Sequence, residues 1–388
     1  MFKILTLNNI SPKGLERFPK KLFEVSSEVT NPDAILLRSF KMHDYPIPES
    51  LKAVGRAGAG VNNIPVEELS KRGIPVFNTP GANANAVAEL VLAGMLIASR
   101  NIMSAWEFAK NLQGTDKEIS KLVEDGKKNF VGVELPNKTL GVIGLGAIGV
   151  KVANNGIALG MKVIGYDPLL TVERALQLNS AVTKTSSLDE VLAHSDYITF
   201  HVPLMDETKN LLNDTRIKKM KEGVVVLNFS REEIVNEDAI LSGIDNGKIY
   251  AYVCDFPTNK LKNHSRVVTL PHLGASTEEA EENCAIMVVD QVKDFLQNGN
   301  IKNSVNFPDV EMPRTEGHRI SIANSNVPNM VAQISAILSK EGLNILDMLN
   351  KSRKEYAYTL LDVDKEVSPL TLDAIKQIEG VLAVRYYK

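Results

Sequence analysis

Cysteine is scarce in this chain of 388 residues, which contains only Cys254 and Cys284. Two cysteines cannot build a disulfide framework or a multi-cysteine metal site, so a reducing compartment is expected. The chain also lacks an apolar run long enough to span a bilayer, and its first residues read as a strand rather than as a signal peptide. We therefore expect a soluble, cytoplasmic protein with no membrane partner and no metal.

An excess of basic charge is also missing, because the formal net charge is −3. Without a basic field, a nucleic acid is not an expected partner, and any anionic ligand must be held by a few local arginines. The length exceeds what one hydrophobic core usually serves, so two or three domains are expected.

Short apolar runs alternate with helical stretches along most of the chain. In the first part, strands are predicted at 2–7, 34–37, 53–56 and 74–77, followed by a helix at 83–98 that is apolar on nearly all sides. Residues 111–138 are polar and rich in lysine, which suggests a crossing into a new unit. From Thr139 onward, strands are predicted at 140–143, 162–166, 197–201, 224–228, 249–254 and 267–270, with a long helix at 276–296. Strict alternation of strand and helix predicts a parallel sheet.

A third pattern follows the proline-containing connection at 306–313. Its predicted order is strand, helix, strand, strand, helix, strand, at 318–322, 329–340, 344–350, 356–363, 369–378 and 381–386. This βαββαβ order is typical of a small ferredoxin-like domain.

The sequence Gly144-Leu-Gly-Ala-Ile-Gly149 lies between a predicted strand and a predicted helix. Glycines at this spacing allow a tight turn, close backbone approach to a pyrophosphate and close packing of helix on strand. Asp167 ends the next strand, where a carboxylate accepts hydrogen bonds from ribose hydroxyls and repels a 2′-phosphate. The pattern therefore predicts a Rossmann-type domain that binds NAD rather than NADP.

Two polar residues follow later strands of the same predicted sheet: Arg231 after 224–228 and His272 after 267–270. Ligands of open α/β sheets lie beyond the carboxyl ends of the strands, so both should reach one cleft. A histidine can exchange the proton of a hydroxyl group, and an arginine can hold a carboxylate bidentately. Together they suit hydride transfer to or from a 2-hydroxy acid.

These motifs resemble those of the D-isomer-specific 2-hydroxyacid dehydrogenases, and in particular of phosphoglycerate dehydrogenases with a C-terminal ACT domain. The matching stretches are Gly55-Arg-Ala-Gly-Ala-Gly-Val-Asn-Asn63, Asn78-Thr-Pro-Gly81, the 144–149 glycines, Phe229-Ser-Arg231 and Pro271-His-Leu-Gly-Ala-Ser-Thr277. The resemblance implies a flavodoxin-like substrate domain at 1–95 and 285–305, an inserted cofactor domain at 96–284 and an ACT domain at 316–388.

The resemblance also implies roles for individual residues, with Arg231 and His272 as the catalytic pair. The cofactor-binding residues would be Gly144, Gly146, Ala147, Ile148, Gly149, Asp167, His201, Val202, Pro203, Ser230, Asp255 and Gly274. The substrate-binding residues would be Arg38, Arg56, Gly58, Ala59, Gly60 and Asn78. In the ACT domain, Asn326 and Asn344 would hold L-serine as an effector, although Asn324 and Asn329 depart from the His and Gly usual there.

One departure concerns the catalytic glutamate that orients the histidine in this family, because Lys260 stands where it is expected. Asp255 and Glu279 are conceivable replacements. The implied reaction is the NAD-dependent oxidation of 3-phosphoglycerate to 3-phosphohydroxypyruvate by a homodimer or homotetramer. Two alternatives stay open: a reductase of hydroxypyruvate, glyoxylate or a similar acid, and a non-catalytic protein that senses NAD or an amino acid.

Overall fold

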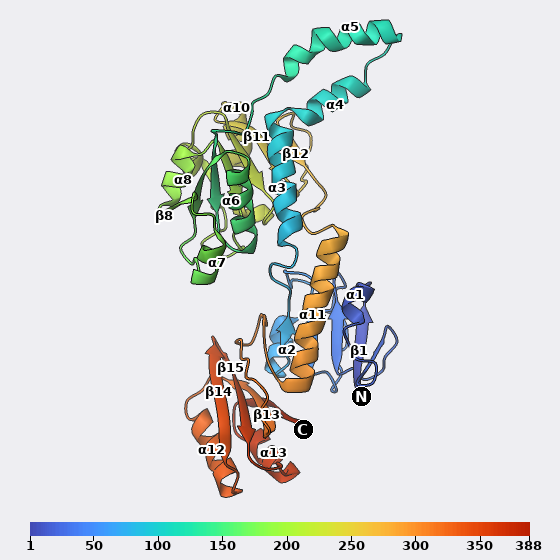
Figure 1. Cartoon of the computed structure of the whole chain (residues 1–388), viewed down its shortest axis with the longest axis vertical. Helices are drawn as coiled ribbons and strands as arrows, with labels where there is room; N and C mark the ends of the chain where they lie inside the picture. Colours follow the sequence, from blue (N-terminus) through green and yellow to red (C-terminus); the bar gives the residue numbers. More distant parts are fainter. The chain divides into compact units, whose positions relative to one another are not determined.

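The computed structural model describes all 388 residues and divides into two compact units (Figure 1). The first unit comprises Met1–Ala82 and Glu278–Lys388, and the second comprises Asn83–Thr277. The chain thus passes from one unit to the other between residues 82 and 83 and again between 277 and 278. The sequence suggested boundaries after residues 95 and 284. The difference at the first division arises because helix α3 (Ala84–Ser99) buries Val87 and Val91 in the core of the second unit.

The first unit contains a five-stranded parallel sheet in the order β2-β1-β3-β4-β5, the flavodoxin-like order. Its strands are β1 (Phe2–Leu7), β2 (Phe23–Ser26), β3 (Ala34–Leu37), β4 (Ala53–Arg56) and β5 (Val76–Phe77), and its helices are α1 (Pro12–Leu15), α2 (Val66–Lys71) and α11 (Glu278–Asn298). Helix α11 packs so closely on β4 that a Cβ atom on Gly55 would lie 2.6 Å from Val288. Residues from the two ends of the chain therefore build one core.

The second unit contains a seven-stranded parallel sheet in the order β12-β11-β10-β9-β6-β7-β8. Its first six strands along the chain follow the doubly wound Rossmann order, in which the strand carrying the glycine turn lies next to the point of reversal. The strands are β6 (Thr139–Ile143), β7 (Lys162–Tyr166), β8 (Thr183–Thr185), β9 (Tyr197–Phe200), β10 (Val224–Asn228), β11 (Ile249–Cys254) and β12 (Val267–Thr269). The remaining helices are α4 (Ile102–Lys110), α5 (Asp116–Gly126), η1 (Lys127–Phe130), α6 (Ala147–Ala158), α7 (Val172–Gln177), α8 (Leu188–His194), α9 (Asp214–Ile217), η2 (Glu232–Ile234) and α10 (Glu237–Asp245).

The polar segment 111–138 forms helix α5 and η1 within the second unit, not a crossing between units. A capping box starts α5, in which the Thr115 side chain and the Glu118 carboxylate satisfy each other's backbone amides. The Thr115-x-x-Glu118 spacing is present in the sequence, but the polar, lysine-rich composition of the segment suggested a connection rather than a helix.

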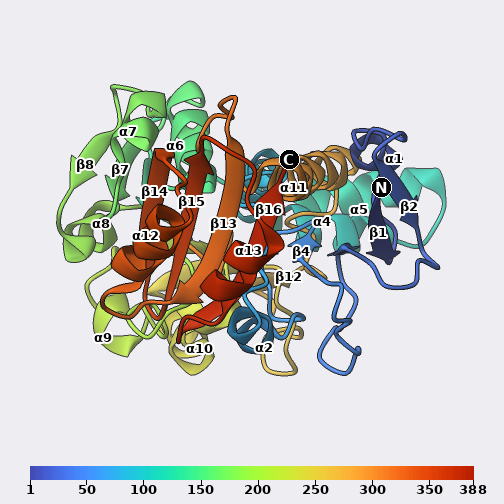
Figure 2. The same ribbon diagram turned by 90° about the horizontal axis from the view of Figure 1, so that it is seen from below.

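The C-terminal part of the first unit is an antiparallel sheet in the order β14-β15-β13-β16. Its strands are β13 (His318–Ser325), β14 (Ile345–Arg353), β15 (Tyr356–Val363) and β16 (Val381–Tyr387), with helices α12 (Met330–Lys340) and α13 (Pro369–Lys376) on one face (Figure 2). The chain order is βαββαβ, as predicted. Together with the two parallel sheets, this domain confirms the predicted fold class.

This C-terminal domain packs on the flavodoxin-like part of the same unit through backbone carbonyls and a shared core. The Tyr358 hydroxyl donates to the Gly299 carbonyl at 2.7 Å, and Arg353 donates to the Ser304 carbonyl at 2.6 Å. The buried cluster that contains Phe295 and Phe307 also contains Tyr358. The contacts are specific, so the two parts form one compact body.

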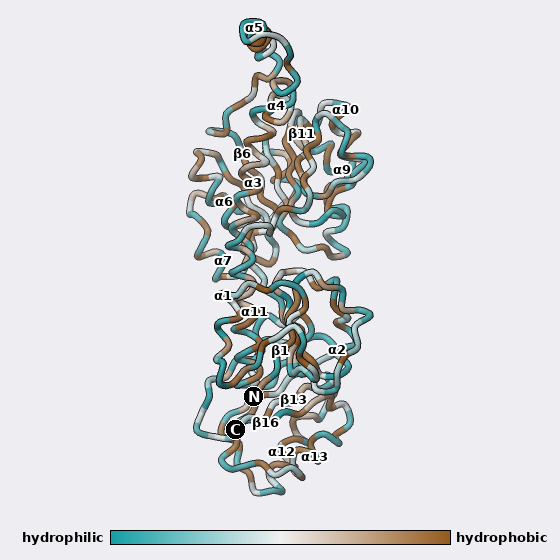
Figure 3. Tube along the Cα trace, turned by 90° about the vertical axis from the view of Figure 1, so that its right-hand side faces the viewer, coloured by the Kyte–Doolittle hydropathy of each residue, from teal (hydrophilic) through white to brown (hydrophobic).

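Apolar residues concentrate in the strands, and polar residues lie mainly on the outer helices and loops (Figure 3). No single helix combines the length and the apolar character needed to cross a bilayer, and the pair that meets both conditions together, Ala84–Ser99 and Ile102–Lys110, is bent by 65°.

Candidate active site

The glycine turn between β6 and α6 has the geometry that a dinucleotide requires. Gly144 has a φ of 92°, which favours glycine, and a Cβ atom on Gly149 would lie 1.8 Å from the Gly144 carbonyl oxygen. A Cβ atom on Gly146 would meet nothing within 4 Å, so the open face of the turn lies at the start of α6. Free amides at a helix N-terminus bind phosphate, and the turn therefore fits NAD.

An alanine at Gly149 and an alanine at Gly146 should have different effects, one on stability and the other on NADH binding. Gly149→Ala should lower the melting temperature, because its methyl group collides with backbone. Gly146→Ala should leave the melting temperature unchanged but weaken NADH binding at least about tenfold, equivalent to about 1.4 kcal/mol, because its methyl group occupies the face that phosphate approaches. Thermal unfolding and NADH fluorescence titration measure the two effects, and unchanged NADH affinity in Gly146→Ala would contradict the assigned cofactor face.

Asp167 follows β7 beside this turn. Its carboxylate accepts hydrogen bonds from the amides of Leu145 and Leu169, both at 2.8 Å. The Leu145 amide belongs to the glycine turn, so Asp167 ties the turn to the end of β7. The carboxylate is thus fixed where the adenosine ribose is expected, which fits NAD.

Three other predicted cofactor residues lie near the ends of β9 and β10. The Ser230 hydroxyl donates to the Val202 carbonyl, and His201 Nε2 lies 3.0 Å from the Thr199 hydroxyl. Burial lowers the pKa of His201 to about 3, and its Nδ1 atom is buried with no partner. His201 is therefore neutral at working pH and unsuited to proton exchange.

Asp255 connects the two predicted catalytic side chains. Burial raises the pKa of Asp255, while the hydrogen bond from the Gly274 amide and the charges of His272 and Arg231 lower it. The side chains of Arg231 and His272 therefore lie within electrostatic reach of one carboxylate near the carboxyl ends of β10, β11 and β12. Arg231, Asp255 and His272 thus follow three neighbouring strands of one sheet.

The loop that carries His272 is held by Asp255 and Phe256. The His272 amide donates to the Asp255 carbonyl at 3.1 Å, and the His272 ring meets the Phe256 ring edge-on at a centroid distance of 5.4 Å. His272 has a φ of 53°, an uncommon conformation for a residue other than glycine. Its side chain is exposed, so the ring is free to meet a substrate.

Asn228 was not singled out by the sequence, but it positions Arg231. Its buried side chain donates to the Arg231 carbonyl at 2.8 Å and accepts from the Ser230 amide at 3.2 Å. A polar residue at the end of the apolar strand β10 was the signal that could have identified it.

Lys260, which replaces the expected glutamate, makes an ion pair with Asp238 at 2.7 Å. Glu279 lies at the start of α11, where its charge acts on Lys13. Of the two conceivable replacement acids, Asp255 is the one that belongs to the same unit as His272.

In the first unit, Arg38 follows β3 directly, and Arg56 is the last residue of the neighbouring strand β4. The Arg56 Nε atom donates to the Arg38 carbonyl at 2.9 Å, and its guanidinium also donates to the Gly60 carbonyl. Arg38 forms an ion pair with Glu281 of α11 at 2.5 Å, a partner that sequence reasoning missed because α11 is remote in the chain. The Arg56 guanidinium therefore lies against the backbone of Arg38, while the Arg38 guanidinium faces α11.

The glycine-rich loop at residues 58–60 is held from both sides. The Asn78 side chain donates to the Ala59 carbonyl at 2.6 Å, and the Thr79 amide donates to the Gly58 carbonyl at 3.1 Å. The predicted substrate residues Gly58, Ala59, Gly60 and Asn78 thus form one structure with Arg56.

Asn326 and Asn344 lie at opposite ends of β15. Asn326 bonds the backbone of Lys354 and Glu355 before this strand, whereas the Asn344 amide donates to the Asp364 carboxylate after it. A strand of eight residues spans about 26 Å at about 3.3 Å per residue. One serine molecule cannot touch both asparagines of the same chain.

Comparison with known proteins agrees with this arrangement. Residues 93–274 match the family described as D-isomer specific 2-hydroxyacid dehydrogenase, NAD binding domain. A D-3-phosphoglycerate dehydrogenase of Haemophilus influenzae is 33% identical over 86% of this chain and 81% of its own length. The chain belongs to the D-isomer-specific 2-hydroxyacid dehydrogenase family.

Other members of this family are similar over comparable stretches. A D-3-phosphoglycerate dehydrogenase of Archaeoglobus fulgidus is 36% identical over 80% of the chain. A solved NAD⁺-bound 3-phosphoglycerate dehydrogenase of Entamoeba histolytica has a TM-score of 0.61 and 27% identity, covering 79% of this chain and 98% of its own. The chain spans only 60% of the Archaeoglobus protein, and similar or smaller shares of two further relatives with the same name. The predicted NAD cofactor is confirmed by the matched NAD-binding domain.

Proposed function

We propose that this member of the family oxidises 3-phosphoglycerate at C2 to 3-phosphohydroxypyruvate with NAD, reversibly, as the entry to serine synthesis. The observation that carries the proposal is that Arg231 and His272 follow β10 and β12 on either side of β11 and Asp255, in the unit that holds the dinucleotide turn. Relatives named D-3-phosphoglycerate dehydrogenase support the choice of substrate. A cytoplasmic location stays a prediction.

In the proposed reaction, His272 takes the proton of the C2 hydroxyl during oxidation and returns it during reduction. Arg231 binds the substrate carboxylate and the oxygen that becomes the carbonyl, because its guanidinium offers two parallel donors and keeps its charge. NAD, when bound, supplies the redox chemistry. Asp255 takes the orienting role of the missing glutamate, since its backbone carbonyl holds the His272 loop and its carboxylate accepts from the Gly274 amide of the same loop.

The direct test is NADH consumption with phosphohydroxypyruvate and, separately, with hydroxypyruvate. A higher kcat/KM for the phosphorylated acid is expected. If neither acid caused NADH consumption, the proposed reaction would be wrong, and the non-catalytic protein that senses NAD or an amino acid would be favoured instead.

Arg38→Ala should raise the KM for phosphohydroxypyruvate about 10- to 100-fold, because a charge-assisted hydrogen bond to phosphate contributes about 1.5–3 kcal/mol. The KM for hydroxypyruvate should stay near the wild-type value, since that acid has no phosphate. Steady-state kinetics on both acids measure the effect. Arg38→Lys keeps the charge but loses the planar guanidinium, so its KM for phosphohydroxypyruvate should lie between those of the wild type and Arg38→Ala.

The reductase of unphosphorylated acids stays the second candidate because of the ion pair between Arg38 and Glu281. A phosphate must compete with this carboxylate for the guanidinium. Glu281→Gln separates the two candidate reactions. If Arg38 binds phosphate, the KM for phosphohydroxypyruvate should be lower in this variant than in the wild type. An unchanged KM would favour the unphosphorylated substrate.

We also propose that the C-terminal domain is an ACT domain that binds L-serine between two copies, within a homodimer or homotetramer. The placement of Asn326 and Asn344 at opposite ends of β15 supports this, because a small amino acid would bridge them only across a pair of chains.

A further inference from the structure

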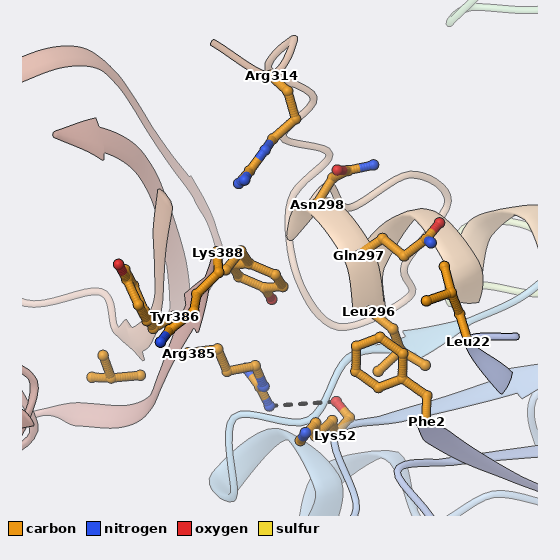
Figure 4. A pocket seen from close by; sticks show the side chains of 12 residues that line it. Phe2, Leu22, Lys52, Leu296, Gln297, Asn298, Arg314, Arg385, Tyr386 and Lys388 are labelled. Atoms are coloured by element: carbon orange, nitrogen blue, oxygen red, sulfur yellow. Dashed lines mark hydrogen bonds between the residues drawn. The ribbon is translucent and has the colours of Figure 1, made fainter. Parts of the chain in front are cut away.

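A pocket of about 720 Å³ lies in the first unit where the C-terminal domain meets the flavodoxin-like part (Figure 4). Four cationic residues line it: Lys52, Arg314, Arg385 and Lys388. None of the lining side chains is acidic, although the chain as a whole has a net charge of −3. The positive charge is therefore a local property of this pocket.

The two arginines of this pocket have no carboxylate partner. Arg314 is exposed and makes no hydrogen bond or ion pair, and its charge acts only at longer range on Asp362, which is already bonded to Arg319. Arg385 donates to the carbonyls of Gly73 and Lys52, and its Nη1 atom is buried with no partner. The protein leaves both arginines without a neutralising anion.

The two lysines of this pocket form only exposed ion pairs, which neutralise their charge weakly. Lys52 pairs with Asp33 and Lys388 pairs with Glu366, but the lysine side chains stay 42% and 77% exposed. Ion pairs this exposed are screened and contribute little, so both lysines can turn toward a bound anion.

The pocket also offers surfaces for the rest of an organic molecule. Phe2, Leu22 and Leu296 provide an apolar side, and the amides of Gln297 and Asn298 lie next to it (Figure 4). Two planar guanidinium groups favour phosphate or carboxylate oxygens over a simple halide.

We propose that this pocket binds a small organic anion with at least two negative charges, at a site separate from the Arg38 and Arg56 pair. Its lining comes from both parts of the first unit: Lys52 and Leu296 from the flavodoxin-like part, and Arg385 from β16 of the C-terminal domain. A ligand that touches both parts stabilises their contact. By linkage, whatever loosens that contact weakens the ligand's binding.

Calorimetric titration of the full-length protein with pyrophosphate tests the site, at constant ionic strength and with saturating NADH so that the glycine turn is occupied. Saturable binding of pyrophosphate that depends on Arg314 is expected, beside the phosphate binding proposed for Arg38 and Arg56. Arg314→Gln should weaken it about tenfold, as the loss of one charge-assisted contact would. Because Arg314 has no bonded partner, this variant should fold as the wild type does.

Lys351→Gln is the matched control, since Lys351 is an exposed cation of the C-terminal domain that does not line the pocket. It should bind pyrophosphate far better than Arg314→Gln does. Citrate, tested in parallel, tells whether phosphate or carboxylate is preferred, and tighter binding of either supports the site. Equal affinities in Arg314→Gln and the wild type, or no saturable binding of either anion at millimolar concentration, would overturn the proposal. Neither titration depends on enzymatic turnover, so the outcome is independent of the proposed reaction.

Discussion

Replacing His272 by asparagine should lower kcat about 10²- to 10⁴-fold, the usual contribution of a general acid or base. Asparagine is chosen because it tolerates a positive φ, so the 53° backbone of this loop is preserved while the titratable ring is lost. NADH affinity should stay within about threefold of the wild type, because a proton-exchanging group stabilises the transition state rather than the bound cofactor. Steady-state kinetics and NADH fluorescence titration measure the two quantities.

His264→Asn provides the control in the same unit, since the His264 ring lies 3.5 Å from Asp245 and has no predicted role. It should retain wild-type kcat. If His272→Asn also kept kcat within a factor of about ten, proton exchange by this residue would be excluded. If it lost kcat and NADH binding together, His272 would be a structural residue of the cofactor site.

Arg319→Met should destabilise the C-terminal domain by about 3–5 kcal/mol, the usual cost of removing one partner of a buried ion pair. Arg319 and Asp362 are 0% and 1% exposed, and the guanidinium bonds the Asp362 carboxylate at 2.6 and 2.9 Å. It also donates to the carbonyls of Asn298, Met312 and Pro313. The substitution leaves one charge and three carbonyls without this donor. Urea unfolding followed by the near-ultraviolet circular dichroism of tyrosine measures the loss.

The effect should depend on pH in a defined direction. Burial raises the pKa of Asp362, but the hydrogen bonds from Arg319 and Thr315 lower it more, so the folded value lies below the usual one. The carboxylate therefore stabilises the fold above the unfolded pKa of about 3.9, and this contribution is lost as the pH falls through the folded value. The difference in the free energy of unfolding between the wild type and Arg319→Met should therefore become smaller at acidic pH.

Two further variants separate a buried pair from a surface pair. Arg17→Met breaks the exposed pair with Asp290 and should leave the urea midpoint nearly unchanged. The double variant Arg319→Met/Asp362→Leu should recover part of the loss, because no unpaired charge remains buried. An Arg319→Met protein as stable as the wild type would refute the assigned role.

The sequence predicts the fold well where a largely apolar strand lies in the interior of its parallel sheet. Strands Ala34–Leu37, Lys162–Tyr166 and Val224–Asn228 match the structure at both ends. Strand β2 (Phe23–Ser26) was missed because it is short, and two of its four residues are exposed. Edge strands of this kind depend on pairing with a neighbour, which the local sequence does not encode.

The candidate site is predictable to the extent that it depends on motifs read along the chain. The glycine turn, Arg231 and His272 each follow a recognisable strand, and the parallel topology brings their loops to one edge. Glu281 beside Arg38 and the pocket around Arg314 were not predictable, because they arise from contacts between segments remote in sequence. Such pairs are fixed only by the tertiary fold.

The flavodoxin-like sheet is completed by a helix encoded after the entire second unit. While the ribosome synthesises residues 83–277, the surface of β4 around Gly55 has no Val288 to cover it. The nascent N-terminal strands must therefore stay incompletely folded, with apolar groups open to water or to a chaperone, although the inserted unit already has its whole sheet. Folding of this protein in the cell is thus expected to begin in the middle of the chain and to end at its N-terminal strands.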